Sequence, residues 1–187
     1  SQLLEELVRA AQSLADRRVG ALMVIERESS LADQIDAGTP VNADLCKDLL
    51  ESLFNTSSPL HDGAVVIRDG RIASAGCILP LTLRTDLPDG VGTRHRAAVG
   101  ITEETDAVVI VVSEETSKIA VVMAGEMIHG LEAPELRRVL YDIMAGDRRD
   151  LHADSETGEA GESGAPAQVA GADEAEAPVE RTAVRPG

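Results

Sequence analysis

Two short polar stretches contain the residues whose types and spacing suit chemistry on a phosphate group. The first, Leu60-His61-Asp62-Gly63-Ala64, places an imidazole and a carboxylate directly before an apolar run. Such a pair can bind a divalent metal or accept a proton. The small residues Gly63 and Ala64 let a ligand approach the backbone closely. In the alternative interpretation, Asp62 caps a turn and His61 is an exposed loop residue.

The second stretch, Gly92-Thr93-Arg94-His95-Arg96, follows a glycine-broken loop and leads into a run of small residues. Thr93 is predicted to be the N-cap of a helix. Free N–H groups at a helix start, flanked by the guanidinium groups of Arg94 and Arg96, form an anion site. The pattern therefore predicts phosphate binding. The alternative is a solvated charge run that pairs with nearby carboxylates.

The remaining polar positions give weaker signals. Ser113-Glu114-Glu115-Thr116 follows an apolar run and is either a simple turn, which is favoured, or a loop that faces phosphate and metal. His129 and His152 are expected to be incidental. The common phosphate loops GxxxxGK[ST] and GxGxxG are missing, as are the GxSxG and HExxH motifs of hydrolases and zinc peptidases.

Composition restricts both the core and the partners. The 187 residues suffice for one domain with a substantial core, and the aromatic content of 1% means that this core consists of Val, Ile, Leu and Ala. An aromatic platform for stacking bases is therefore excluded. The net charge of −16 argues against nucleic acid as a partner, whereas a small anion in a local basic pocket is compatible with it. Two cysteines without metal spacing fit a reduced cytosolic protein.

Hydrophobic patterning predicts how these stretches are positioned. Helices are expected at 2–16, 43–54, 94–105 and 132–145, and strands at 19–25, 63–67, 71–79, 107–112 and 118–123, with an extended piece near 127–128. Residues 26–39 are expected to be mostly loop. From about Asp147 onward the composition is acidic, and apolar periodicity ends. The prediction is one α/β domain over 1–146 and a disordered acidic tail over 147–187.

Taken together, Asp62-Gly63-Ala64 and Thr93-Arg94-His95-Arg96 resemble the paired motifs of the diadenylate cyclase (DAC) domain family. Residues 17–22 and 112–116 are similar to the CdaA-like branch of that family. The resemblance implies an α/β fold with a central mixed sheet wrapped by helices. It also implies synthesis of cyclic di-AMP from two ATP molecules, with release of pyrophosphate.

The resemblance also implies roles for individual residues. Asp62, within the catalytic motif that Gly63 and Ala64 complete, is expected beside the attacking ribose 3′-hydroxyl as a metal ligand or base. His61 and Asp62 are expected to bind Mn²⁺ or Mg²⁺. Ile78, where relatives often have tyrosine, and backbone groups around Leu79 are expected to face adenine. The residues expected to surround the phosphates are Gly92, Thr93, Arg94, His95, Arg96, Ser113 and Glu115.

The same resemblance makes catalysis depend on a face-to-face homodimer, because one domain holds one ATP. Two alternatives are a catalytically silent module that binds ATP or cyclic di-AMP, and a structural oligomerisation domain. CdaA-like proteins carry transmembrane helices ahead of this domain, whereas no run of this sequence has the length of an apolar span. The chain is therefore expected to be the cytoplasmic part of a membrane-anchored enzyme, or a soluble variant.

Overall fold

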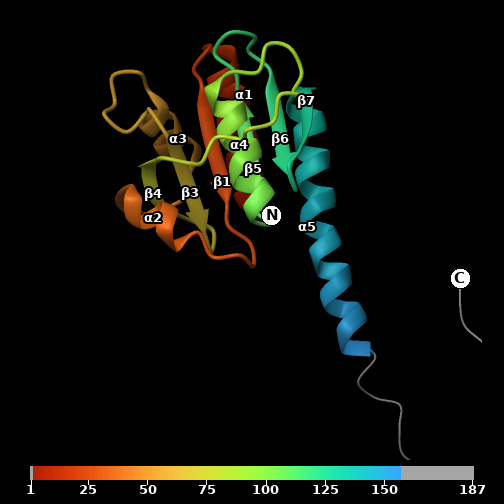
Figure 1. The fold of residues 1–187 in the computed structure, drawn as a ribbon. Helices are drawn as coiled ribbons and strands as arrows, with labels where there is room; N and C mark the ends of the chain where they lie inside the picture. The colour runs from red at the N-terminus through yellow and green to blue at the C-terminus, as the bar shows by residue number, and fades with distance from the viewer. Residues whose placement is uncertain (1, 157–187) are drawn as a thin grey trace, which may run out of the picture.

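A computed structural model describes residues 2–156 of the chain, and the side chains of residues 2–146. Helices and strands alternate along much of the chain (Figure 1). The helices are α1 (Gln2–Asp16), α2 (Ala32–Ala37), α3 (Lys47–Phe54), α4 (Thr93–Glu104) and α5 (Ala133–Glu156). The strands are β1 (Ala21–Ile25), β2 (Thr39–Asp44), β3 (Ala64–Arg68), β4 (Arg71–Cys77), β5 (Val108–Val112), β6 (Ile119–Met123) and β7 (Glu126–Leu131).

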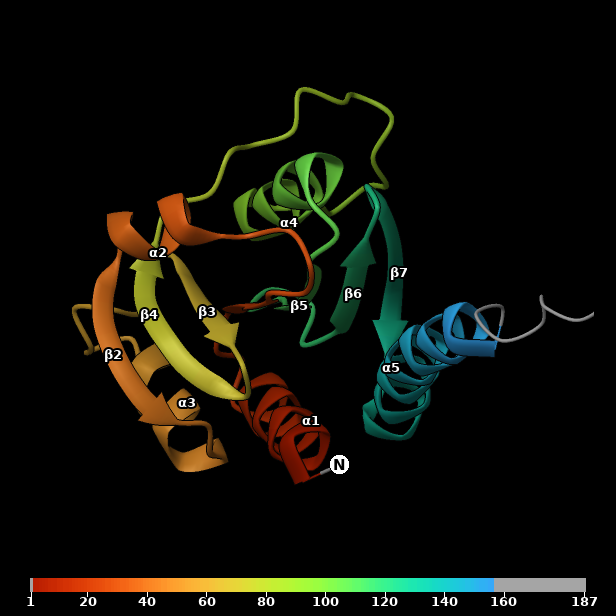
Figure 2. The ribbon, with the colours of Figure 1, turned by 90° about the horizontal axis from the view of Figure 1, so that it is seen from below.

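The strands form one seven-stranded sheet in the order β2-β4-β3-β1-β5-β6-β7. β1 runs parallel to β3 and antiparallel to β5, so the sheet is mixed. Every residue of β1 and of β5 is buried, as expected for central strands whose two faces are both covered. Helix α4 lies on one face, and α1, α3 and α5 lie on the other (Figure 2). The predicted α/β class with a mixed sheet wrapped by helices is confirmed.

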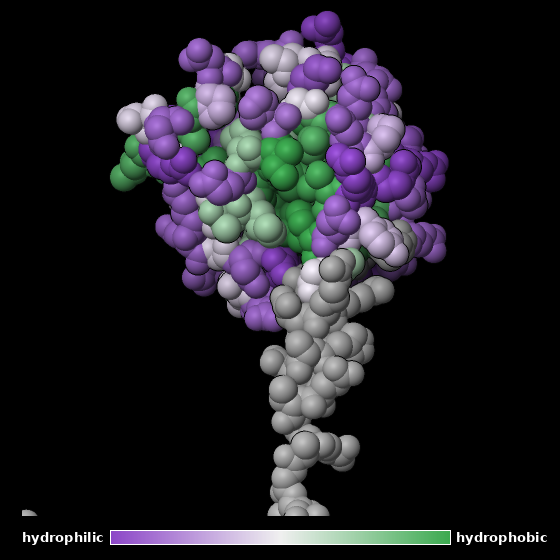
Figure 3. All heavy atoms as spheres, turned by 90° about the vertical axis from the view of Figure 1, so that its right-hand side faces the viewer, coloured by the Kyte–Doolittle hydropathy of each residue, from purple (hydrophilic) through white to green (hydrophobic). Residues whose placement is uncertain are grey.

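Aliphatic side chains form a separate core on each face of the sheet. Between the sheet and α1, α3 and α5, the core includes Leu7, Met23 and Phe54; between the sheet and α4, it includes Val24 and Ile101. On the side formed by β7 and α5, apolar residues gather in one area bordered by polar ones (Figure 3). The second of these cores packs α4 against the sheet, and α4 carries the second polar stretch.

The structure corrects several predicted boundaries. Residues 39–44, divided in the prediction between a loop and the start of a helix, form the edge strand β2, which pairs with β4 through a bulge. Asn42 lies in this strand with φ 50°, and α3 begins only at Lys47 instead of at residue 43. Helix α2 lies in the segment predicted to be mostly loop. A bulged edge strand lacks the apolar alternation on which strand prediction depends.

Helix α5 continues to Glu156, beyond its predicted end near Ala145. The predicted boundary between domain and tail, at 146, therefore falls inside this helix. The tail predicted beyond Glu156 lies outside the described residues, and so does the side chain of His152.

Candidate active site

The turn that carries Asp62 is held against β4 by a glycine that no other residue can replace without strain. Gly63 has φ 120°, and a Cβ at this position would lie 2.8 Å from the carbonyl carbon of Gly76 and 2.9 Å from the oxygen of Cys77. Both neighbours are backbone atoms, which cannot rotate away. The pairing of β3 with β4 is irregular between Ala64 and Val66. These constraints fix the backbone of Asp62 at the end of the sheet.

A cleft of about 650 Å³ brings together residues that lie far apart in the sequence. Asp62 borders it just before β3, Ile78 and Leu79 just after β4, and Thr93 and Arg94 from the start of α4. The full lining is Leu22, Asp62, Gly63, Gly76, Cys77, Ile78, Leu79, Leu81, Thr93, Arg94, Ala97 and Glu114. The two polar stretches thus face one cleft.

Arg94 borders the cleft and contacts both backbone and a carboxylate. Its guanidinium packs against the backbone of Gly20, where an added Cβ would lie 2.6 Å from Arg94 Cζ. Nη1 lies 3.4 Å from Oε2 of Glu114. Within the described part of the chain, the buried Nε has no hydrogen-bond partner. Because Arg94 borders the cleft, an anionic ligand there would interact favourably with its guanidinium charge.

A second cavity of about 180 Å³ adjoins the cleft at the start of α4. Gly92, not Thr93 as predicted, is the N-cap, with φ −88° and ψ −173°, and no side chain caps the helix. The first N–H groups of α4 are therefore available to an anion. The lining residues are Gly90, Gly92, Thr93, Arg94, His95, Val112, Ser113, Glu114 and Glu115. We refer to this space as the helix-start pocket.

Arg96 has a different environment from Arg94. Its Nη2 donates to the carbonyl of Thr82 at 2.8 Å, and Thr82 N donates to the carbonyl of Arg96 at 3.1 Å. Arg96 borders neither the cleft nor the helix-start pocket. The residue therefore ties the loop before α4 to the helix, and its predicted contact with phosphate stays a prediction.

The residues present fit a divalent metal that arrives together with a nucleotide. Nδ1 of His61 lies 2.7 Å from the carbonyl of Ser58, so a proton on Nδ1 leaves the Nε2 lone pair free for a metal. In residues 2–146 no three His, Cys, Asp or Glu side chains are grouped to hold a metal by themselves. Mg²⁺ is usually bound by one or two carboxylates together with substrate phosphates. Asp62 supplies one such carboxylate beside the cleft, and Nε2 of His61, the preceding residue, is a further donor.

Comparison with known proteins places these features in a family. Residues 8–127 match the DAC family model, described as DisA bacterial checkpoint controller nucleotide-binding. The chain belongs to the DAC family. Cyclic di-AMP synthase CdaA of Bacillus subtilis is 41% identical over 147 residues, which cover 79% of this chain and 54% of that protein. A diadenylate cyclase of Listeria monocytogenes is 44% identical over 138 residues, covering 74% and 50%. The chain thus spans about half the length of these relatives.

Solved structures agree with this membership in the DAC family. DacA from Staphylococcus aureus, a double mutant, is 38% identical, and the match covers 75% of this chain and 94% of that one with a TM-score of 0.73. A Bacillus cereus protein described as hypothetical and membrane spanning is 44% identical, with coverage of 68% and 62% and a TM-score of 0.65. Among the described residues of this DAC chain, no helix is long and apolar enough to cross a membrane.

His95 of the DAC motif is half-buried, and its pKa lies below the usual value for histidine. Burial is the main cause, the positive charges of His129 and Arg94 add to it, and Glu115 partly offsets them. The lowered pKa of His95 therefore reflects mainly its burial at the start of α4.

The lowered pKa of His95 predicts that acid destabilises the wild type more than His95→Gln. Between the folded and unfolded pKa values the unfolded chain binds more protons, so stability is greatest above about pH 6.5 and falls as the pH drops below it. We expect the free energy of unfolding in urea to fall less between about pH 7.5 and pH 5.5 in the variant. Equal losses in both proteins would contradict the assignment.

Two residues near the DAC motif were not identified as site residues from the sequence. A third cavity, of about 170 Å³, lies on the other side of His95 and is bordered by Lys118 and by His129, which was expected to be incidental. The remaining lining is Pro88, Asp89, Gly90, Val91, Thr116, Ile119, Ala120, Met127 and Gly130. Neither residue stands in a motif. Only the pairing of β6 with β7 brings both to this place.

Proposed function

We propose that the chain is a diadenylate cyclase domain, which condenses two ATP molecules into cyclic di-AMP and releases two pyrophosphates. The observation that carries the proposal is the single cleft bordered by Asp62 on one side and by Thr93 and Arg94 on the other. Phosphoryl transfer requires mainly that the reacting groups are positioned and that charge is neutralised. The names of the relatives, diadenylate cyclase and cyclic di-AMP synthase, support the same reaction.

In each transfer the ribose 3′-oxygen of one ATP forms a bond to the α-phosphorus of the other. The bond from that phosphorus to the bridging oxygen of the β-phosphate breaks, and pyrophosphate leaves with the electron pair. The hydroxyl proton passes to the Asp62 carboxylate or to water. Arg94 and the uncapped N–H groups of α4 hold the phosphate oxygens on which charge develops. A second transfer in the opposite direction closes the ring.

His61 and Asp62 are the residues that would hold Mn²⁺ or Mg²⁺. A metal bound there neutralises phosphate charge and lowers the pKa of a coordinated hydroxyl group. Glu114 and Glu115 border the helix-start pocket, where they would repel an uncompensated triphosphate. The presence of these carboxylates favours a substrate that carries a cation.

The adenine is proposed to lie against Ile78 and Leu79. Leu79 is 7% exposed and Ile78 is 81% exposed, so Leu79 forms the floor of the cleft and Ile78 forms its outer wall. An aliphatic wall excludes water from the base but gives no ring stacking. Selectivity for adenine then depends on backbone groups near Leu79.

Two chains are proposed to face each other during the reaction. Each described chain offers one cleft that joins Asp62 to Arg94, and two nucleotides must meet for cyclisation. Ile78, Leu81 and Leu83 are large apolar side chains at or next to the rim, and Leu83 is 93% exposed. A face-to-face partner would cover such residues. By analogy with relatives, we also propose that the parent protein is membrane-anchored with this domain in the cytoplasm.

The alternative is a silent module that binds ATP or cyclic di-AMP without turnover. Incubation with ATP and Mn²⁺ or Mg²⁺, followed by anion-exchange chromatography and a pyrophosphate assay, separates the two functions. We expect cyclic di-AMP with two pyrophosphates per molecule. ATP binding by calorimetry without product under either metal would leave the silent module as the better description.

A further inference from the structure

Three adjoining cavities lie in a row across one end of the sheet, and we call this row the track. The cleft and the helix-start pocket share Thr93, Arg94 and Glu114. The helix-start pocket and the third cavity share Gly90 and His95, whereas the cleft and the third cavity share no lining residue. The order along the track is therefore fixed: the cleft, then the helix-start pocket, then the third cavity, which we call the terminal cavity.

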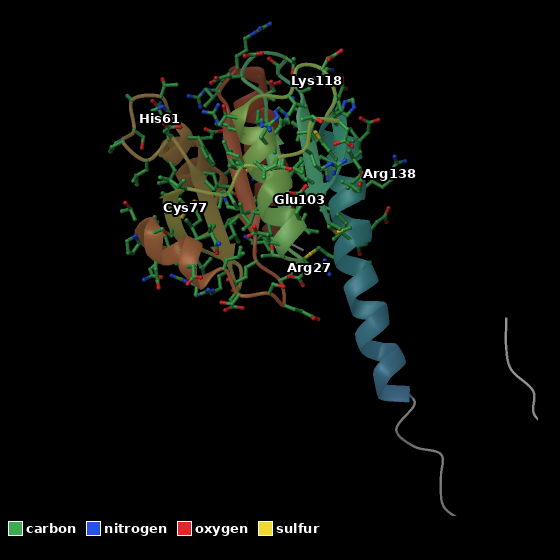
Figure 4. All side chains as sticks on the ribbon, in the orientation of Figure 1. Arg27, His61, Cys77, Glu103, Lys118 and Arg138 are labelled. Carbon is green, nitrogen blue, oxygen red and sulfur yellow. The ribbon has the colours of Figure 1, made fainter. Side chains whose placement is uncertain are left out.

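Basic residues border the terminal cavity. Lys118 precedes β6 and His129 lies in β7, and His95 separates them from the helix-start pocket. Figure 4 shows Lys118 at the same end of the sheet as the start of α4, on the side away from His61. Asp89 is the acidic residue among the described lining residues. The cavity thus combines the Lys118 ammonium and two imidazoles with one carboxylate.

Lys118 is available to a stronger partner than its present one. Its Nζ lies 3.6 Å from Oε1 of Glu132, and the two side chains are 54% and 72% exposed. An exposed ion pair at this distance contributes little, because water screens it. A phosphate carries more charge than one carboxylate and would displace Glu132 without leaving a buried charge behind.

We propose that Lys118 and His129 bind the terminal phosphate of ATP, so that this domain distinguishes a nucleoside triphosphate from a diphosphate. The inference rests on the proposed function for the orientation of the nucleotide. With adenine at Ile78 and the reacting α-phosphate between Asp62 and Arg94, the remaining phosphates must continue along the track past His95. The terminal cavity is where that direction leads.

The terminal cavity also suits the pyrophosphate leaving group. Negative charge builds on pyrophosphate as its bond to the α-phosphorus breaks, and cations fixed at the far end of the track stabilise that charge. Lys118 and His129 are thus specificity residues in the ground state. They also favour departure of pyrophosphate away from the attacking hydroxyl.

The test compares two ligands that differ by one phosphate. The α,β-methylene analogues of ATP and ADP cannot be cleaved at the reacting bond, and their dissociation constants are measured by calorimetry with Mg²⁺ on the full chain. In the double variant Lys118→Met/His129→Gln we expect affinity for the ATP analogue to fall about tenfold or more. Affinity for the ADP analogue should stay within about twofold of the wild-type value, so most of the preference for the ATP analogue is lost.

Glu132→Gln is the matched control, because it removes the same exposed ion pair and keeps both cationic residues. Its ATP-to-ADP ratio should equal that of the wild type. An equal fall for both ligands in the double variant, no fall for either, or a wild type that binds neither analogue would overturn the inference. A wild type that distinguishes the analogues but makes no cyclic di-AMP would refute the proposed reaction and leave this inference standing.

Discussion

Asp62→Asn should lower the rate of cyclic di-AMP formation by about a thousandfold or more, while the melting temperature stays close to that of the wild type. Asparagine has the shape of aspartate but cannot accept the proton of the 3′-hydroxyl, and its amide is a poor ligand for Mn²⁺ or Mg²⁺. The side chain borders the cleft and is exposed, so no buried contact is lost. The rate is measured by chromatography of cyclic di-AMP with ATP and metal in excess.

Asp69→Asn is the control for this change. Asp69 lies in the turn between β3 and β4, at the other end of β3, with φ 51°, which asparagine tolerates well. It should keep the wild-type rate. The assignment of Asp62 fails if Asp62→Asn retains a rate within about tenfold of the wild type. If activity and melting temperature fall together, Asp62 acts through the fold instead.

Sequence predicted the interior of this domain better than its edge. The apolar run Val108–Val112 becomes a strand in which every residue is buried, because a central strand covered on both faces needs only continuous hydrophobicity. Thr39–Asp44 contains proline and polar residues, and its pairing with β4 determines its conformation. Local propensity contains no information about a partner strand that lies about thirty residues away along the chain.

The same distinction applies to the site. Asp62 and Arg94 stand in motifs, and the structure places both on one cleft. Lys118 and His129 have no motif, and only strand pairing brings them to one cavity. Arg96 shows the opposite case: a motif arginine whose guanidinium donates to the Thr82 carbonyl instead of bordering the cleft. Residue type predicted which side chains suit phosphate. Which of these side chains border the cleft and which support the fold depends on the loop before α4.

The contact of that loop with α4 predicts a second large effect, from Gly100→Ala. An added Cβ would overlap the carbonyl oxygen of Pro80 and lie 2.9 Å from both the carbon of Pro80 and the nitrogen of Thr82. These are backbone atoms, so either the helix or the loop must move. We expect the free energy of unfolding in urea to fall by about 3 kcal/mol. Affinity for ATP in the folded fraction should fall as well, because a displaced loop moves Ile78 and breaks the Arg96–Thr82 contact.

Gly146→Ala provides the comparison for Gly100→Ala. Gly146 lies in α5, and among the described residues no atom outside its own helix backbone lies within 4 Å of an added Cβ. Alanine there should therefore leave stability unchanged or raise it by up to about 1 kcal/mol through helix propensity. The same propensity gain accompanies Gly100→Ala, and a net loss therefore measures the steric conflict with the loop. If both variants unfold at the same urea concentration as the wild type, the loop moves aside without loss of stability. The loop would then be too flexible to hold adenine beside the phosphate groups on α4.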